Sequence, residues 1–383
     1  MKILMVSMFS NHFFNWTEQL KGSGYDIYWL DVFDSNTYVN KINFVHQIIG
    51  WRNKLDYPGR YWIKNHLPGL NRIINRFNQR KLEEMVDRKI QEIRPDVVQS
   101  FVLFSAAYPI IPVMEKYPEI KWIYSAWGND LYYMQQIPEE LNKIKDSLPL
   151  FDYMFADCKR DRELGAELGF KGKYLGTFPG GGGYESAKWK DSMIAFEDRK
   201  IILIKGYEGM LGRASYVIEA ISKMQDSLKS YEIIIFGCST ELKPHLEEKG
   251  IIRWDNVKVL EQISHTEVMK AMGSAFLYIG NCISDGMPNT LLEAIVMGAF
   301  PIQSNPGGAS AEIIDHGVNG FLIDNPENSQ EIQSLIQRAL RDCLFMKSAT
   351  AYNFEHILPK LEREYITGQV LAKYCQVELE LDK

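Results

Sequence analysis

The fold of this 383-residue chain is decided by the stretch Asp285-Gly286-Met287-Pro288-Asn289-Thr290-Leu291-Leu292-Glu293. Two carboxylates stand eight positions apart, separated by a Gly-Met-Pro loop and an expected helix start. Proline suits the first turn of a helix, and Asn289 or Thr290 can cap it. The N–H groups at a helix N-terminus suit a diphosphate. The stretch therefore predicts an anion site, with Glu293 one turn inside the helix to accept hydrogen bonds from ribose or sugar hydroxyls.

The residues that follow extend this pattern. They include Pro306-Gly307-Gly308-Ala309-Ser310-Ala311-Glu312-Ile313-Ile314 and Gly317-Val318-Asn319-Gly320-Phe321-Leu322. Together with the first stretch, they resemble the donor-site signature of retaining glycosyltransferases of family four, which have the GT-B fold. The family's first acid is nearly always glutamate, whereas Asp285 is one methylene shorter. The resemblance implies that Glu293 binds the ribose, and that Asp285 with the Gly286–Thr290 loop positions the donor sugar.

The resemblance also implies a clamp for the diphosphate. Lys205 ends an expected strand and Arg213 leads into the next helix, where the family has Arg followed by Lys-Gly. A cation at a helix start opposes the helix dipole, so an anion beside Arg213 would explain its position. Gly237 lies in a loop after the expected strand 233–236, and Gln262 and Ile263 follow the expected strand 257–260. The predicted catalytic residues are Asp285, Glu293, Lys205 and Arg213, and the predicted donor-binding residues are Gly286, Met287, Pro288, Asn289, Thr290, Leu291, Gly237, Gln262 and Ile263.

The acceptor side is expected in the first half of the chain. Asn11 and His12 follow the first strand, where the family has a Gly-Gly loop that this chain lacks. Trp127, Asn129 and Asp130 follow a later strand, where relatives carry His-Gly-x-Asp. His12 is either an acceptor-side base or a structural residue. Trp127, in place of the family's histidine, either stacks on a sugar or packs in the protein.

Short apolar runs alternate with helical patterns along both halves, which is typical of parallel sheets covered by helices. A length of 383 residues suits two domains. We expect an acceptor-binding Rossmann-like domain at 1–180, a nucleotide-sugar-binding one at 181–352 and a C-terminal helix at 353–383. The GT-B resemblance implies that the two doubly wound domains face each other across a cleft and that the last helix packs back on the first domain. The expected strands are 3–8, 26–32, 97–102, 122–126, 153–156, 174–178, 201–205, 233–236, 257–260, 276–279, 300–303 and 321–323.

Composition favours a cytoplasmic protein. The five cysteines form no C-x-x-C pair, which indicates a reducing compartment and no structural zinc. No apolar run approaches the ~18 residues of a membrane-spanning helix, and the N-terminus lacks a signal-peptide cleavage site.

Positive charge is concentrated in residues 41–81. This stretch has nine basic residues and one acid, Asp56, so it carries +8 while the whole chain carries −6. It also contains several Trp, Tyr and Phe residues. This composition suits an anionic membrane surface, a nucleic acid or a solvated cationic face. The acidic balance of the whole chain argues against nucleic acid.

The sequence thus predicts a retaining, metal-independent glycosyltransferase without a cofactor. Its donor would be a UDP- or GDP-sugar and its acceptor a hydroxyl group. The acceptor is expected to be lipid-linked or a surface-polysaccharide intermediate, with the protein peripheral on the inner face of the membrane. The alternatives are a catalytically idle nucleotide-sugar-binding relative, or a GT-B enzyme of other chemistry such as a nucleotide-sugar epimerase or a phosphorylase.

Overall fold

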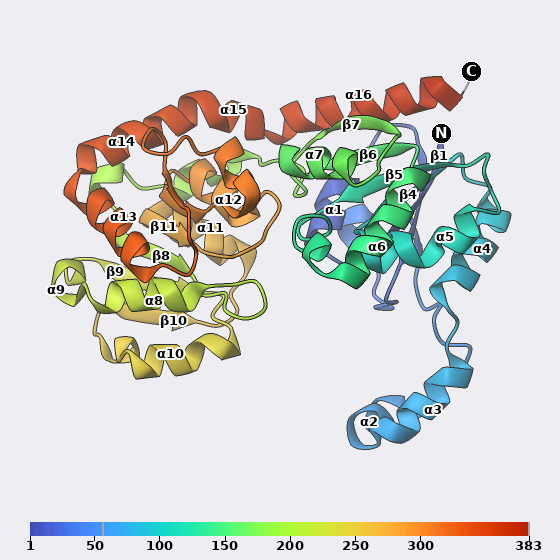
Figure 1. Ribbon diagram of the computed structural model, residues 1–383, viewed down its shortest axis with the longest axis horizontal. Helices are drawn as coiled ribbons and strands as arrows, with labels where there is room; N and C mark the ends of the chain where they lie inside the picture. Colours follow the sequence, from blue (N-terminus) through green and yellow to red (C-terminus); the bar gives the residue numbers. More distant parts are fainter. Residues whose placement is uncertain (56, 382–383) are drawn as a thin grey trace. The chain divides into compact units, whose positions relative to one another are not determined.

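The computed structural model describes residues 1–55 and 57–381, and the chain divides into two α/β units (Figure 1). The first unit contains Met1–Ala156, Asp161–Gly181 and the chain from Gln369 onward. The second contains Asp157–Arg160 and Gly182–Gly368. The sequence placed the first change of domain after residue 180 and began the returning segment at 353. The division into units places these changes after Gly181 and after Gly368.

The first unit is built on a seven-stranded parallel sheet in the order β3-β2-β1-β4-β5-β6-β7. Helices cover it on both sides (Figure 1), and the central strands are buried. The strands are β1 Lys2–Ser7, β2 Asp26–Asp31, β3 His46–Ile48, β4 Val97–Phe101, β5 Lys121–Ala126, β6 Tyr153–Ala156 and β7 Lys173–Thr177. The helices are α1 Asn11–Glu18, α2 Arg60–His66, α3 Pro68–Asn78, α4 Leu82–Ile93, α5 Ile111–Met114, α6 Pro138–Ser147 and α7 Lys159–Glu167.

The second unit repeats this architecture with a six-stranded parallel sheet in the order β10-β9-β8-β11-β12-β13. Its strands are β8 Ile201–Lys205, β9 Glu232–Phe236, β10 Val257–Leu260, β11 Ala275–Gly280, β12 Phe300–Ser304 and β13 Phe321–Ile323. The helices are α8 Ala214–Ser222, α9 Gln225–Leu228, α10 Lys243–Glu248, α11 His265–Ser274, α12 Asn289–Val296, α13 Ser329–Arg341, α14 Cys343–Tyr352 and α15 Leu358–Leu361. Ile, Val, Leu and Phe side chains from the strands and helices form its core.

The twelve strands expected from the sequence are confirmed, with ends that differ by one residue at most. The sequence missed β3, because it is short and lies inside the basic stretch. Its register pairs Tyr28 with His46, and their rings stack at 4.6 Å. None of the helices in the described part of the chain is long and apolar enough to span a membrane.

The last helix, α16 Arg363–Leu381, contributes its second half to the core of the first unit. Tyr374 is fully buried there. Its hydroxyl donates to Gln99 Oε1 at 2.6 Å and accepts from Trp16 Nε1 at 3.0 Å. In the sequence, Tyr374 is 275 positions from Gln99 and 358 positions from Trp16, so one hydroxyl group joins distant parts of the chain.

Tyr374→Phe should lower the free energy of unfolding of the first unit by about 1–3 kcal/mol, because it leaves a buried indole N–H and a buried amide oxygen without partners. Urea denaturation followed by tryptophan fluorescence measures this. The control is Tyr38→Phe, since Tyr38 is 53% exposed in the same unit. Equal stability of the two variants would contradict a structural role for the Tyr374 hydroxyl.

Candidate functional site

The carboxyl edge of the second sheet contains the natural place for a ligand. The strands β9 and β10 lie on one side of β8, whereas β12 and β13 lie on the far side of β11. The winding therefore reverses between β8 and β11, and open α/β sheets bind ligands outside the strand ends at such a point. Lys205 ends β8 and Gly280 ends β11. The loops that follow these two strands form the candidate site.

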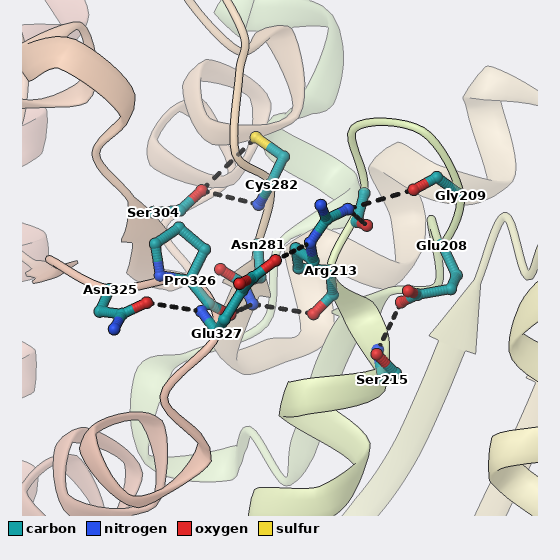
Figure 2. Close-up of polar contacts among 11 residues, drawn as sticks. Glu208, Gly209, Arg213, Ser215, Asn281, Cys282, Ser304, Asn325, Pro326 and Glu327 are labelled. Carbon is teal, nitrogen blue, oxygen red and sulfur yellow. Dashed lines mark hydrogen bonds and ion pairs between the residues drawn. The ribbon is translucent and has the colours of Figure 1, made fainter.

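Hydrogen bonds join these loops to each other. Arg213 N donates to Asn281 O at 3.1 Å, and Ile283 N donates to Leu211 O at 2.9 Å. Asn281 Nδ2 donates to Arg213 O and to Pro326 O, each at 2.8 Å (Figure 2). Asn281 is only 4% exposed. This residue, which the sequence analysis missed, ties three loops together. The only signal for it is a polar residue directly after a buried strand.

Arg213 is held in one orientation by acceptors of the chain itself. Its Nε donates to Glu327 Oε1 at 2.6 Å, and Nη1 donates to Gly212 O at 2.8 Å and Gly209 O at 3.1 Å (Figure 2). Its Nη2 makes no hydrogen bond to the part of the chain that the structure describes. An arginine has five N–H donors in a planar fork, so Nη2 offers two fixed donors to a ligand.

Negative charge beside Arg213 comes from two glutamates. Glu327 forms the ion pair, and Glu208 Oε2 accepts from Ser215 N at 2.7 Å at the start of α8. The sequence indicated that an anion near Arg213 would explain a cation at a helix start. The chain supplies such anions itself, so the position of Arg213 does not by itself require a bound ligand.

Lys205 lies half-buried at the end of β8. Its ammonium is 5.8 Å from the centre of the Tyr207 ring, a cation–π contact. It forms no ion pair with any residue in the described ranges 1–55 and 57–381. Its charge is therefore not neutralised by a neighbouring carboxylate of the described chain.

The helix start predicted at Asn289 or Thr290 is confirmed, since α12 begins at Asn289 after Pro288. Asp285 is half-buried, and its Oδ1 accepts from Gly286 N at 2.9 Å. A Cβ on Gly286 would lie 2.2 Å from Asp157 Oδ2, so a larger residue there would require the Asp157 side chain to move. Thr290 Oγ1 accepts from Tyr278 OH at 2.8 Å.

Glu293 is 7% exposed and pairs with His265, a residue that the sequence analysis did not include in the site. Its Oε1 lies 2.8 Å from His265 Nε2. His265 is the first residue of α11, which Ser264 and Glu267 cap reciprocally. Glu293 Oε2 makes no hydrogen bond to a residue of the described chain. One carboxylate oxygen is thus fixed and the other remains an acceptor.

The other predicted donor residues differ in exposure. The side chains of Met287 and Leu291 lie in the apolar core, so only their backbone can contact a ligand. Gly237 is exposed with a φ of +60°, a conformation that favours glycine. Gln262 is exposed, whereas Ile263 packs against the core.

The predicted acceptor-side residues all belong to the first unit. Asn11 and His12 are exposed at the start of α1, which Ser10 caps by accepting from Phe13 N at 3.2 Å. Trp127 is half-buried, and its ring packs on Phe101 at 4.8 Å and on Trp16 at 6.1 Å. Part of the Trp127 ring is therefore buried by packing within the protein, and the rest is exposed. Asn129 is half-buried and its carbonyl accepts from Met134 N at 3.3 Å.

Asp130 is 4% exposed. Its Oδ2 accepts from Leu103 N at 2.7 Å and from Tyr124 OH at 2.9 Å. Burial raises the pKa of Asp130 to about 7, although both hydrogen bonds act to lower it. The carboxyl group is therefore a proton-binding site near neutral pH.

Comparison with known proteins agrees with this geometry. Residues 186–354 match the family model of the glycosyl transferases group 1. The matched segment contains every predicted donor-side residue, and the predicted acceptor-side residues lie outside it. No curated protein sequence matches the chain.

Solved structures extend the likeness to the whole chain. Sucrose-phosphate synthase from Thermosynechococcus elongatus superposes with a TM-score of 0.73 at 14% identity, covering 99% of both chains. Anabaena HepE in complex with UDP and glucose gives 0.67 at 12% identity, covering 98% of this chain and 99% of that one. A glycosyltransferase from Rickettsia africae gives 0.67 at 14% identity, covering 100% and 98%. These likenesses show that the chain has the GT-B fold.

The raised pKa of Asp130 predicts a pH-dependent stability. The folded chain keeps the proton up to about pH 7, whereas the unfolded chain loses it near the ordinary value of 3.8. The stabilisation is therefore complete below about pH 4 and is lost as the pH rises to about 7. Asp130→Asn cannot ionise, so wild-type stability relative to this variant should fall by roughly 1.4 kcal/mol per pH unit between about pH 5 and pH 7.

Urea unfolding of both proteins across this range measures the difference. Asp146→Asn is the control for loss of a carboxylate, because Asp146 is exposed in the same unit. A constant difference between wild type and Asp130→Asn would show that Asp130 ionises normally.

Proposed function

We propose that the chain is a retaining, metal-independent glycosyltransferase of family four that uses a UDP- or GDP-sugar. The observation that carries the proposal is the gathering of Lys205, Arg213 and Glu293 around the switch point of a glycosyl transferases group 1 domain. The complex of the GT-B neighbour HepE with UDP and glucose supports a nucleotide-sugar donor.

The free donors and acceptors suggest how the donor is held. Arg213 Nη2 and Lys205 Nζ would donate to the diphosphate, together with the first N–H groups of α12. Glu293 Oε2 would accept from the ribose hydroxyls, while His265 holds the other oxygen. Asp285 and the Gly286–Thr290 loop would position the sugar, and Gly237, Gln262 and Ile263 would lie beside the nucleoside.

The proposed reaction breaks the bond between the anomeric carbon and the β-phosphate oxygen. The acceptor oxygen bonds to the anomeric carbon on the same face, and its proton passes to the departing diphosphate. Fixed cations at the diphosphate stabilise its growing negative charge. Asn11, His12, Trp127, Asn129 and Asp130 are proposed to lie on the acceptor side.

The acceptor is proposed to be a lipid-linked or surface-polysaccharide intermediate, with the protein in the cytoplasm and peripheral on the inner face of the membrane. The excess of nine basic residues over one acid in residues 41–81 supports a membrane-held acceptor.

The proposal predicts that UDP or GDP binds and that the clamp residues are required. Arg213→Ala and Glu293→Ala should each weaken nucleoside diphosphate binding at least tenfold, because each removes charged hydrogen bonds worth about 1.5–3 kcal/mol. Isothermal titration calorimetry measures the affinities. With a labelled nucleotide sugar, the wild type should release sugar slowly to water and transfer it to an acceptor with retained anomeric configuration.

Arg253→Ala is the matched control, because Arg253 is exposed in the same unit. Unchanged affinity in the Arg213 and Glu293 variants would show that the donor binds elsewhere. Binding without hydrolysis or transfer would indicate an idle relative, and isomerisation of the donor sugar would indicate an epimerase.

The Arg213–Glu327 ion pair predicts that loss of the Glu327 charge strengthens nucleoside diphosphate binding, whereas loss of Arg213 weakens it. Glu327 is partly exposed and lies beside the guanidinium that would meet the diphosphate. Glu327→Gln keeps the shape of the side chain and removes its charge, so nucleoside diphosphate affinity should rise a fewfold, in line with ~0.2–1 kcal/mol for exposed pairs. Calorimetry at low and high salt measures this, with the exposed Glu241→Gln as control. A loss of affinity would show instead that Glu327 orients Arg213.

A further inference from the structure

Helices α2 and α3 project from the rest of the first unit on a narrow connection (Figure 1). Antiparallel hydrogen bonds close this connection, since Lys54 N donates to Asn78 O and Arg80 N to Arg52 O, each at 2.7 Å. The Asn78 side chain adds bonds to both backbone groups of Leu55, at 2.8 and 2.9 Å. Residues 60–78 are called the projecting helix pair below.

The structure separates the basic stretch 41–81 into two parts. One part is used within the fold, because these side chains donate to backbone carbonyls or pair with nearby acids. The basic side chains of this part are therefore not available for the membrane contact that was expected of the whole stretch. The fold-bound residues are Lys41 with Glu18, Arg52 with Val32 O, Lys54 with Phe77 O, Arg80 with Trp51 O, and Lys81 with Glu83. Asp56 lies outside the described residues.

The other part of the stretch is the projecting helix pair, which carries an exposed apolar face. No residue of α3 is buried. Leu70, Ile73 and Phe77 follow helical spacing and are 46%, 60% and 71% exposed. In and after α2, Trp62 is 58% and Leu67 is 42% exposed. Large apolar side chains that gather on a surface mark an interaction site.

The charges beside this face are all positive. Residues 60–78 contain no acid. Lys64, Arg72 and Arg76 are exposed and form no ion pair with residues of the described chain. Arg72 and Arg76 stand one helical turn apart. Basic side chains that flank Trp, Phe and Leu are typical of helices that lie in the interface of an anionic bilayer.

We propose that the projecting helix pair binds an anionic bilayer surface. Ile73 and Phe77 enter the acyl boundary, Trp62 sits at the headgroup level, and Lys64, Arg72 and Arg76 reach lipid phosphates along their apolar stems. A second copy is a poorer occupant, because a two-fold contact through this face would bring like charges together. The inference deepens the proposed membrane-held acceptor and does not depend on the donor site.

The test is flotation of the full chain with vesicles of phosphatidylcholine alone or with about one third phosphatidylglycerol. The wild type should float with the anionic vesicles only, and high salt should release much of it. Ile73→Ser with Phe77→Ser, and separately Arg72→Gln with Arg76→Gln, should each lower partitioning at least tenfold.

Matched controls come from the second unit. Leu344→Ser removes an apolar side chain that is 79% exposed, and Arg253→Gln with Arg341→Gln removes two exposed cations. These variants should float like the wild type. No flotation of the wild type, equal flotation with neutral vesicles, or equal loss in the controls would overturn the proposal.

Light scattering tests whether a second copy of the chain, and not a bilayer, covers this face. A concentration-dependent dimer that Ile73→Ser with Phe77→Ser abolishes would assign the face to a second copy and overturn the bilayer proposal. Nucleoside diphosphate calorimetry on the same variants keeps the two proposals apart. Flotation without nucleotide binding would refute the proposed donor site and leave the bilayer proposal standing.

Discussion

The hydrogen bonds of the Asn281 amide are the constraint on which the candidate site depends. One nitrogen binds the carbonyls of Arg213 and Pro326, which belong to loops after β8 and after β13. Because Asn281 is buried at the end of β11, its position follows from the sheet and not from the loops. Asn281 fixes the backbone of Arg213, and the guanidinium is then oriented by Glu327 and by two backbone carbonyls of its own loop. A rigid strand thereby orients a cation that lies on a glycine-rich loop.

Much of this arrangement follows from sequence pattern. The apolar runs predict the strands, and Pro288 with Asn289 predicts where α12 begins, because both signals depend on residues close together in the chain. The side-chain pairs that complete the site join residues that are far apart in the sequence. Arg213 and Glu327 are 114 positions apart, and His265 and Glu293 are 28 apart. Only the strand order brings such residues together, so no local pattern marks them. The strand β3 was missed for a related reason, since its three residues gain their structure from pairing with β2.

The buried carboxylates Glu293 and Asp130 have different hydrogen-bond partners. The Glu293 Oε1 atom lies beside the His265 imidazole, whereas Asp130 Oδ2 accepts from the backbone N–H of Leu103 and the Tyr124 hydroxyl. Burial outweighs these neutral donors and raises the pKa of Asp130 to about 7. Asp130 thus combines proton binding near neutral pH with hydrogen bonds that fix the chain at Leu103.

The projecting helix pair differs from both cores in what holds it together. Its connection to the sheet is made by backbone hydrogen bonds and by the Asn78 amide, and α3 buries no side chain. Folding of the first unit therefore gains little from the apolar character of Ile73 or Phe77. Exposing such side chains to water costs about 25 cal/mol for each Å². A face that does not stabilise the fold and is costly to expose to water supports the proposed contact with a bilayer, and its positive charge supports an anionic one.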